Sequence, residues 1–269
     1  MVEIFDDIRK LYRFKDACAE LLPYIEFFSE TSLDAMRENI ASEIFTVKLF
    51  PSYTPTIWLN LGAPYQLANG NKSVSIDSHT DILILRNQIV ERRNLPTDNI
   101  FTVKFNPGGF EAIFGVEQGK IENAVVDVKT IVSSSILQKL KRLYDFDDRV
   151  TMLQNHFLHL LNKRFSDAYR YQKVCSTLHA FHLSHMRLNN QQLADELMIT
   201  AKSLNRYFKR FVGTPPKTYF SIVRARTALT AYVLNKDGFS SADYGYYDKS
   251  HFYKDVLKFT GQTLSDCRS

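Results

Sequence analysis

The first half of the chain contains short runs of β-branched and aromatic residues separated by turn residues. Between residues 43 and 105 these runs are EIFTVKLF, TIWLNL, KSVSI, DILILR, QIVERR and NIFTVKF. Asn69-Gly70-Asn71 and Asn106-Pro107-Gly108-Gly109 are typical turn sequences between strands. A series of short strands with tight connections predicts a small β-barrel or sandwich.

After Gly115 the apolar positions are three and four residues apart, which predicts helices. One such stripe comprises Ile136, Leu137, Leu140 and Leu143. A second begins beside the capping candidates Asp147 and Asp148 and comprises Val150, Leu153, Phe157 and Leu160. A third comprises Tyr171, Val174, Leu178, Phe181 and His185. Helices are therefore expected to link the β-rich region to the last third of the chain.

Residues 189–213, NNQQLADELMITAKSLNRYFKRFVG, predict two short helices joined by a tight turn at Met198 and Ile199. Asn189 and Gln192 have the spacing of a capping box at the first helix. The inward side of that helix is expected to carry Leu193, Ala194 and Leu197.

Thr200 can cap the second helix, and Gly213 can end it. Its apolar positions, Leu204, Phe208 and Phe211, recur at i, i+4 and i+7. The outward side then carries Lys202, Ser203, Asn205, Arg206 and Lys209. A short helix, a tight turn and a basic, amide-bearing second helix are typical of a DNA-reading helix-turn-helix. An ordinary αα-hairpin with a solvated basic face gives the same local pattern.

A repeat 48 residues further along favours the DNA-reading interpretation. The shift takes the stripe of the second helix to Phe252, Val256 and Phe259, and Gly213 to Gly261. It also takes Thr200 to Asp248 and Arg206 to Lys254. A solvated surface has no need of such a duplication. Between the copies, a proline pair opens a predicted helix with Tyr219, Val223, Leu229 and Val233 on one side. About 18 residues at 1.5 Å each would hold the two units about 27 Å apart.

The net charge of +5 is unevenly distributed. Residues 1–169 carry 19 basic and 22 acidic residues, a net charge of −3, whereas residues 170–269 carry 15 and 7, a net charge of +8. A basic module joined to a slightly acidic one is typical of a polyanion-binding protein. A well-solvated basic surface would have the same composition.

Residues 170–269 resemble the DNA-binding domain of the AraC/XylS family of bacterial transcription regulators. The resemblance rests on LADELMIT at 193–200, SLNRYFKRFVG at 203–213, PPKTY at 215–219, RARTA at 224–228 and GYYDKSHF at 245–252. It implies two helix-turn-helix units about a connecting helix, binding near promoters. The implied base-facing residues are Lys202, Ser203, Asn205 and Arg206 in the first unit, and Lys249, Ser250, His251 and Lys254 in the second. Phosphate contacts are expected from Lys209, Arg210 and Lys217.

The second unit departs from the family pattern. Where the first unit has Leu193-Ala194, the shifted positions are Ser240-Ser241 or Ser241-Ala242. Val256 replaces a usual Phe, Leu257 occupies a usually basic site, and the P-x-x-Y ending becomes Leu264 to Cys267. This unit can therefore also be interpreted as a structural remnant that packs but reads little DNA.

The N-terminal region resembles the β-rich, cupin-like sensor half of some members of the family, through YTPTIWLNLGAPY at 53–65 and FTVKFNPGGFEAIFGV at 101–116. That resemblance implies an effector-binding or dimerising domain. Candidate pocket residues are Tyr53, Trp58, Tyr65 and Phe105. Aromatic residues on strands are also ordinary core residues.

Enzymatic and metal-dependent functions find little support in the sequence. His79 is the only histidine in residues 1–150, and no nucleophile elbow, Walker loop or dinucleotide fingerprint is present. Cys175, His179 and His182 share a helical face, as they would also in plain packing. Three scattered cysteines indicate reduced thiols rather than disulfides. We expect no enzyme, no metal and no cofactor.

The sequence thus predicts an α+β protein: a β-barrel or sandwich-like domain, then an all-α domain with two helix-turn-helix units joined by a linker helix. The predicted divisions are 1–146, a regulatory domain; 147–169, a connecting helix that is a candidate for dimerisation; and 170–269, the DNA-binding domain. Double-stranded DNA is the expected partner. RNA polymerase, a small-molecule effector and a second copy of the chain are further candidates.

The sequence also predicts a location. No apolar run reaches the roughly 18 residues of a membrane span, and the N-terminus MVEIFDDIRK lacks the pattern of a signal peptide. We expect a cytoplasmic protein with no membrane partner. The competing function is a ligand-sensing or protein-interaction regulator that has lost strong DNA binding.

Overall fold

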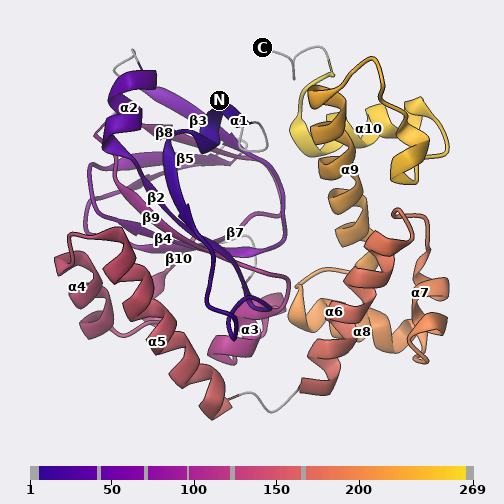
Figure 1. Ribbon diagram of the computed structural model, residues 1–269, viewed down its shortest axis with the longest axis horizontal. Helices are drawn as coiled ribbons and strands as arrows, with labels where there is room; N and C mark the ends of the chain where they lie inside the picture. The colour runs from indigo at the N-terminus through magenta and orange to yellow at the C-terminus, as the bar shows by residue number, and fades with distance from the viewer. Residues whose placement is uncertain are drawn as a thin grey trace.

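The computed structural model describes residues 6–40, 44–69, 72–95, 97–121, 125–164 and 168–264. The chain forms two halves that lie side by side, a β-rich N-terminal half and a helical C-terminal half (Figure 1). In the described residues, none of the helices combines the length and the apolar character that crossing a membrane requires.

Two antiparallel sheets form the N-terminal half. The larger has the order β1 (Tyr12–Lys15), β2 (Ile25–Thr31), β9 (Ile100–Phe105), β4 (Pro55–Asn60), β7 (Ile82–Leu85) and β10 (Val125–Asp127). The smaller has the order β3 (Phe45–Leu49), β8 (Val90–Asn94), β5 (Tyr65–Asn69) and β6 (Lys72–Ile76). The predicted sandwich followed by an all-α region is therefore confirmed. The turn expected at Asn69-Gly70-Asn71 falls partly outside the described residues.

Both faces of the larger sheet are covered. One face packs against the smaller sheet through a core that includes Val47, Trp58, Leu67 and Ile84. The other face packs against α3 (Gly109–Phe114), α4 (Ser134–Arg142) and α5 (Phe146–Arg164). Every residue of β4 and β9 is consequently buried. The polar residues of these strands, Thr56, Asn60, Thr102 and Lys104, are therefore buried as well.

The sequence patterns missed four strands, β1, β2, β5 and β10, and several short helices. Those helices are α1 (Asp6–Arg9), α2 (Leu33–Asn39), α3, η1 (Gln118–Lys120) and η2 (Val128–Thr130). Strand β2 is hidden in the sequence because it buries polar residues, among them Glu30. Arg149 of α5 donates a hydrogen bond of 2.6 Å to the Glu30 carboxylate, and this pairing makes the burial tolerable.

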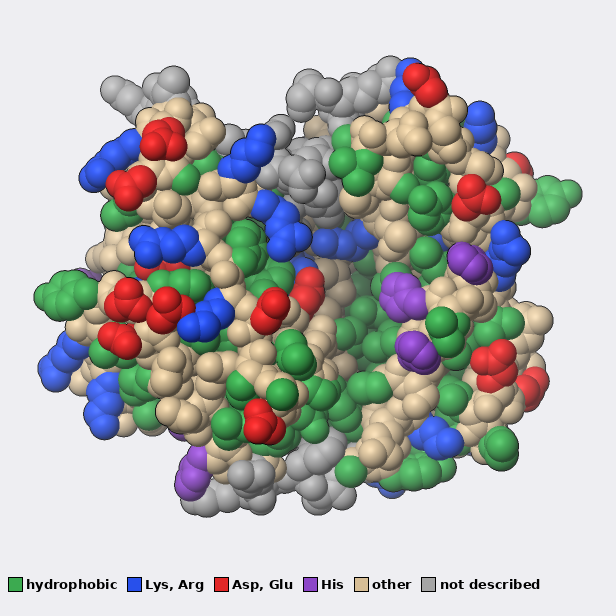
Figure 2. All heavy atoms as spheres, in the orientation of Figure 1, with side chains coloured by type: hydrophobic (Ala, Val, Ile, Leu, Met, Phe, Trp, Pro, Cys, Tyr) green, Lys and Arg blue, Asp and Glu red, His purple; other side chains and the backbone are tan. Residues whose placement is uncertain are grey.

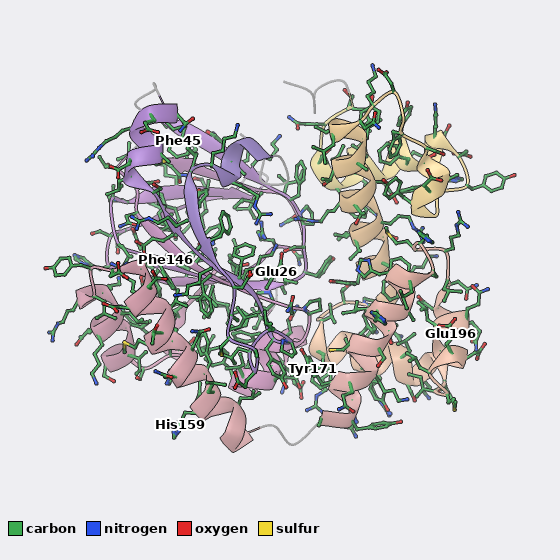
Figure 3. All side chains as sticks on the ribbon, viewed as in Figure 1. Glu26, Phe45, Phe146, His159, Tyr171 and Glu196 are labelled. Atoms are coloured by element: carbon green, nitrogen blue, oxygen red, sulfur yellow. The ribbon has the colours of Figure 1, made fainter. Side chains whose placement is uncertain are left out.

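Helix α5 shares the core of the β-rich half. Val150, Leu153 and Phe157 pack on the larger sheet together with Phe146, which Figure 3 labels at the start of the helix. Asp145, rather than the expected Asp147 or Asp148, caps this helix by accepting hydrogen bonds from the backbone N–H groups of both. The apolar face of α5 is thus already covered within the chain. The divisions at 146 and 169 and the role of α5 in dimerisation stay predictions.

The helical half comprises α6 (Ala168–Leu183), α7 (Asn190–Glu196), α8 (Ala201–Phe211), α9 (Pro216–Leu234), η3 (Ser241–Tyr244) and α10 (Lys249–Thr260). The predicted capping box joins Asn189 and Gln192, and Thr200 and Asp248 cap α8 and α10. Gly213 and Gly261 adopt positive φ at the ends of those two helices, as expected.

Helix α9 connects two cores of the helical half. Its first turns contribute Tyr219 and Phe220 to the core formed with α6, α7 and α8. Its later turns contribute Ala228, Leu229 and Tyr232 to the core formed with α10. Val223 and Val233, expected on the buried side, are half-buried.

The two halves meet where α8 ends. The Gln118 side chain of η1 is fully buried, and its amide donates hydrogen bonds of 2.6 Å to the carbonyls of Tyr53 and Val212. Tyr171 of α6 stacks on Tyr24 and donates a 2.7 Å hydrogen bond to the Pro23 carbonyl. Figure 3 places Tyr171 at this contact between the halves.

Gly109 allows the close approach of two backbone segments, and its replacement should destabilise the β-rich half. A Cβ at this position would lie 2.0 Å from the carbonyl oxygen of Tyr24, which is backbone and cannot move aside cheaply. We expect Gly109→Ala to lower the free energy of unfolding by about 3 kcal/mol or more, as for severe overpacking. Chemical denaturation measures the change. Gly238→Ala is the control, because its Cβ meets only the Asn235 side chain; equal losses in the two variants would contradict the explanation.

Met198, in the turn between α7 and α8, should gain stability as glycine. Its φ is +53°, and its side chain is 93% exposed. A side chain in the left-handed region costs roughly 1 kcal/mol, and glycine avoids that cost. We expect Met198→Gly to raise the midpoint of thermal unfolding by a few degrees, whereas Met198→Ala, which keeps the Cβ, should give no gain. A lower midpoint for the glycine variant would contradict this expectation.

Candidate nucleic-acid interface and interdomain cavity

Helix α8 has an apolar buried side and a cationic exposed side, as its period predicts. Leu204 and Phe208 are 0% exposed, and Phe211 is 1% exposed. Lys202, Arg206 and Lys209 are exposed. The Thr200 hydroxyl accepts a hydrogen bond from the Ser203 backbone N–H, which fixes where the helix starts. Cations one turn apart along the exposed side of a capped helix can follow the edge of a nucleic-acid groove.

The two polar candidates between these cations are less accessible. Ser203 and Asn205 are half-buried. The Thr200 hydroxyl donates a 3.1 Å hydrogen bond to the Ser203 hydroxyl. The amide oxygen of Asn205 is covered and has no hydrogen-bond partner within the part of the chain that the structure describes. Asn205 would have to rotate before it could pair with a base, so Arg206 is better placed of the two.

Helix α10 repeats the arrangement of α8. Phe252 is 0%, Val256 1% and Phe259 8% exposed. The four base-facing candidates, Lys249, Ser250, His251 and Lys254, are all exposed. The backbone N–H of His251 donates a 2.8 Å hydrogen bond to the Asp248 carboxylate and lowers the pKa of that carboxyl. The helix N-terminus is therefore capped by a carboxylate that stays ionised at neutral pH.

The element before α10 differs from its counterpart in the first unit. Where α7 is a helix with Leu193 and Ala194 buried, η3 is a single 3-10 turn in which Ser241 is the buried residue. The core anchor expected to be absent is indeed absent. Aromatic rings occupy the space instead: Phe239 stacks on Tyr244 and packs on Phe252, which also contacts Tyr246. The second unit thus keeps a packed core without a first helix of full length.

The three phosphate candidates have different surroundings. Lys209 and Lys217 are exposed. Arg210 is half-buried, and its Nε donates a 2.7 Å hydrogen bond to the carboxylate of Glu111, which is itself 5% exposed. In this structure Arg210 therefore joins α8 to α3 of the other half. Sequence periodicity places Arg210 on the helix surface but cannot show what that surface touches.

A cavity of about 620 Å³ lies between the β-rich half and α9. Of the candidate effector residues, only Trp58 lines it. Tyr65 and Phe105 are buried in the two cores of the β-rich half, and Tyr53 packs against the core around α8. The aromatic residues singled out in the sequence therefore identified one residue of the cavity lining, Trp58, and none of its charged residues.

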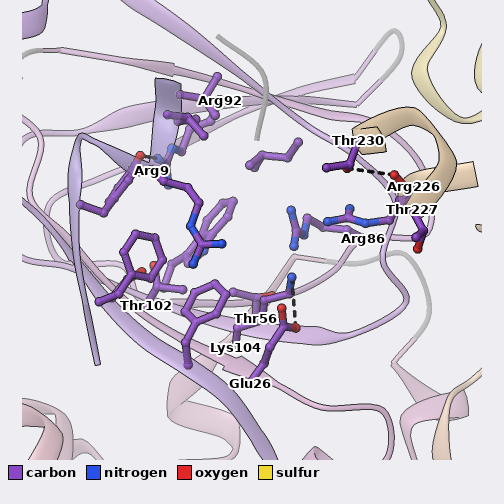
Figure 4. Close-up of a pocket in the computed structure, with 18 of the residues that line it drawn as sticks. Arg9, Glu26, Thr56, Arg86, Arg92, Thr102, Lys104, Arg226, Thr227 and Thr230 are labelled. Carbon is purple, nitrogen blue, oxygen red and sulfur yellow. Dashed lines mark hydrogen bonds and ion pairs between the residues drawn. The ribbon is translucent and has the colours of Figure 1, made fainter. Parts of the chain in front are cut away.

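Five cations and one acid line this cavity: Arg9, Arg86, Arg92, Lys104, Arg226 and Glu26. Figure 4 shows Arg9 and Arg86 on opposite sides of the space, with Arg226 of α9 beside Arg86. Arg86, Arg92 and Lys104 are only 2%, 4% and 5% exposed. In the space-filling view, basic side chains gather in the cleft between the halves (Figure 2).

Part of this charge is compensated within the protein. Lys104 pairs with Glu26 at 3.2 Å, and Arg226 donates to the carbonyls of Phe50 and Pro51. Arg92 donates a 2.6 Å hydrogen bond to the Tyr12 hydroxyl and lies 4.9 Å from the centre of the Trp58 ring. The carbonyl and hydroxyl acceptors are neutral, and Glu26 is the one acid among the lining residues, so the lining itself carries a net positive charge. The cavity is suited to an anion.

Cys18 and Cys175 are free thiols. Cys175 and His179 line a separate surface hollow beside α6, and burial lowers the pKa of His182. Within the described ranges, no three His, Cys, Asp or Glu side chains come together in a way that could hold a metal ion.

Comparison with known proteins supports the assignment of the C-terminal third. The family model described as "Helix-turn-helix domain" matches residues 193–269. No curated protein matches the chain.

Solved structures similar to the chain include ToxT and CuxR. ToxT from Vibrio cholerae O395 is 12% identical, covers 83% of this chain and 96% of its own, and has a TM-score of 0.45. The AraC-like transcriptional activator CuxR is 13% identical, covers 84% and 89%, and has a TM-score of 0.29.

The matched residues include α7, α8, α9, η3 and α10, and they contain both capped helices with exposed cations. The chain therefore carries a helix-turn-helix domain in residues 193–269.

Proposed function

We propose that α8 and α10 read promoter DNA from two successive major grooves, and that an anionic small molecule in the interdomain cavity regulates this reading. The observation that carries the first part is the duplication seen in three dimensions. Both helices have a polar N-cap, three buried stripe residues and exposed cations, of which Arg206 and Lys254 occupy matching positions. We further propose a cytoplasmic location, because bacterial promoter DNA lies in the cytoplasm.

The spacing of the two helices supports successive grooves. Helix α9 has 19 residues, so at 1.5 Å per residue it is about 28 Å long. Successive major grooves on one face of B-DNA are about 34 Å apart. A rigid connector of this length allows the two units to enter both grooves without bending the protein.

The proposed contacts divide into two groups. Arg206 reads a base edge directly, since arginine can form two hydrogen bonds with guanine. Asn205 assists after rotating, and Lys249, Ser250, His251 and Lys254 face the second groove. Lys209 and Lys217 meet phosphates. Arg210 is assigned to the contact with Glu111 and contributes to phosphate binding only if that ion pair opens.

An alternative is a ligand-sensing or protein-interaction regulator without strong DNA binding. The observation behind it is the short η3, which leaves the second unit without a helix like α7. A salt series separates the two functions. If several phosphates are contacted, the logarithm of the affinity for duplex DNA falls steeply with the logarithm of the salt concentration. A flat dependence with weak binding would favour the alternative.

The effector part of the proposal rests on the charge of the cavity. Five cations and one acid give the lining a net positive charge, which an anion that enters would offset. The apolar side chains in the lining, such as Phe14, Val47 and Trp58, favour a ligand that also has an apolar body. A carboxylate on an aliphatic or aromatic frame fits both features.

Arg226 gives the cavity a direct connection to the DNA-reading half. It belongs to α9, which carries both units, whereas Arg9, Arg86, Arg92 and Lys104 belong to the β-rich half. An anion held by Arg226 and by the cations of the β-rich half would strengthen the contact between the halves. It would thereby change how freely the two helix-turn-helix units move when they bind DNA. RNA polymerase and a second copy of the chain stay candidate partners, with no surface assigned to either.

Arg206→Ala should lower specific affinity more than general affinity. Loss of a bidentate base contact costs about 1 to 3 kcal/mol on the preferred site and relaxes the preference at one position. Lys209→Ala is the matched control, because loss of a phosphate contact should weaken preferred and random duplexes alike and reduce the salt slope by about 1. Titrations on a selected and a scrambled duplex measure both effects. Equal losses on the two duplexes for Arg206→Ala would show that Arg206 does not read bases.

An anion with an apolar body should stabilise the protein, and a neutral ligand of the same shape should not. At 100 times its dissociation constant, such a ligand adds about 2.7 kcal/mol to the free energy of unfolding. Thermal melts with octanoate and 1-octanol provide the comparison. Arg9→Gln and Arg86→Gln should remove the shift produced by octanoate, whereas Lys217→Gln should keep it. If the alcohol stabilises the protein as well as the acid does, the charge of the cavity is not what selects the ligand.

A further inference from the structure

The exposed face of α10 carries two large apolar side chains among its cations. Tyr253 is 49% exposed and Leu257 is 53% exposed, and they lie one turn apart. Lys249, Lys254 and Lys258 are exposed on the same helix. Isolated apolar residues on a surface need no explanation, but this pair lies on the face that the proposed function turns toward DNA.

The repeat fixes the position of Tyr253 in that face. The buried stripes of α8 and α10 correspond residue by residue at a shift of 48, and so do the N-caps Thr200 and Asp248. At the same shift Tyr253 corresponds to Asn205, and Leu257 corresponds to Lys209. Tyr253 therefore occupies a base-facing position, while Leu257 occupies a position where the first unit has a phosphate candidate.

The packing of α10 accounts for only part of the Tyr253 ring. Its centre lies 5.9 Å from that of the buried Phe252, which supports the ring from one side. Half of the side chain is left in contact with solvent. A rigid aromatic ring with one supported side and one free side can cover a small apolar group at little cost in conformational entropy.

We infer that Tyr253 reads thymine by covering its C5-methyl group in the second major groove. This inference rests on the proposed function, because it requires α10 to lie in that groove. The thymine methyl is the apolar group that a T·A pair presents there, and it distinguishes thymine from the other bases without a hydrogen bond. Burying one methyl corresponds to roughly a four-fold difference in affinity. The cations around Tyr253 hold the helix against the phosphates.

The inference also gives the second unit a distinct mode of recognition. The first unit reads bases through hydrogen bonds donated by Arg206, whereas the second unit reads thymine through the apolar contact of Tyr253 with its methyl group. Leu257 stands where the first unit has Lys209, so the second unit lacks the counterpart of that phosphate contact. Its sequence preference should therefore depend on thymine.

Substitution of deoxyuridine for thymine tests the inference directly, because deoxyuridine lacks only the methyl group. The full chain is first used to select its preferred duplex from random DNA. Each thymine in the half contacted by α10 is then replaced in turn by deoxyuridine, and affinities are measured. We expect one or two positions at which the wild-type chain loses roughly four-fold in affinity. At those positions Tyr253→Ala should bind both duplexes equally, and Tyr253→Phe should keep the preference for thymine.

Leu257→Ala is the matched control, since it removes a similarly exposed apolar side chain from the same helix. It should leave the thymine preference unchanged. The helical content and the melting temperature of each variant show whether it folds. If Tyr253→Ala does not fold, the thymine preference of Tyr253→Phe still tests the inference.

The inference would be overturned by a wild-type chain that is indifferent to deoxyuridine throughout that half-site, or by a thymine preference that survives in Tyr253→Ala. Either result leaves the proposed function intact if Arg206→Ala still loses specific affinity at the other half-site. A chain that selects no DNA sequence at all would instead contradict the proposed function itself, and the inference with it.

Discussion

The arrangement of the helical half depends on the burial of α9 along both halves of its length. Tyr219 and Phe220 belong to one core and Ala228, Leu229 and Tyr232 to another, so one helix fixes the position of two separate units. Ile222 and Ala225, between these groups, pack on Phe259 of α10. With its apolar side chains used in this way, α8 and α10 can only pack with their own stripes inward. The side of each helix opposite its apolar stripe, which carries the base-facing cations, is then left in the solvent.

A second constraint ties this assembly to the β-rich half. Gln118 uses one amide group to hold both the carbonyl of Val212, at the end of α8, and the carbonyl of Tyr53. Tyr53 has a φ of +51°, an unfavourable conformation for a residue with a side chain. Nearby, Gly119 leaves no room for a Cβ against the Lys209 carbonyl. Tyr53 is therefore better explained by the junction between the halves than by an effector pocket.

The sequence was most informative where a single period determined both burial and function. The stripes of α8 and α10, their caps and their terminating glycines follow from local spacing, and all were predicted. Strand β2 was missed because the burial of Glu30 depends on Arg149, 119 residues away. The same limit applies to Arg210, whose ion pair with Glu111 spans 99 residues. Local patterns show which residues of one helix or strand are buried together, but not which residue from a distant part of the chain will contact them.

The interdomain cavity shows why overall charge is a poor guide to local charge. Residues 1–169 have a net charge of −3, yet they contribute four of the five cations in the lining. These cations come from segments far apart in the chain: Arg9 from α1, Arg86 from just after β7, Arg92 from β8 and Lys104 from β9. The base-facing cations of α8 and α10, Lys202, Arg206, Lys249 and Lys254, are exposed, so water and salt screen their attraction to a polyanion. Those of the cavity are mostly buried, where an anion would meet little screening. One protein can thus use the same two residue types for salt-sensitive contact with a large polyanion and for selective contact with a small one.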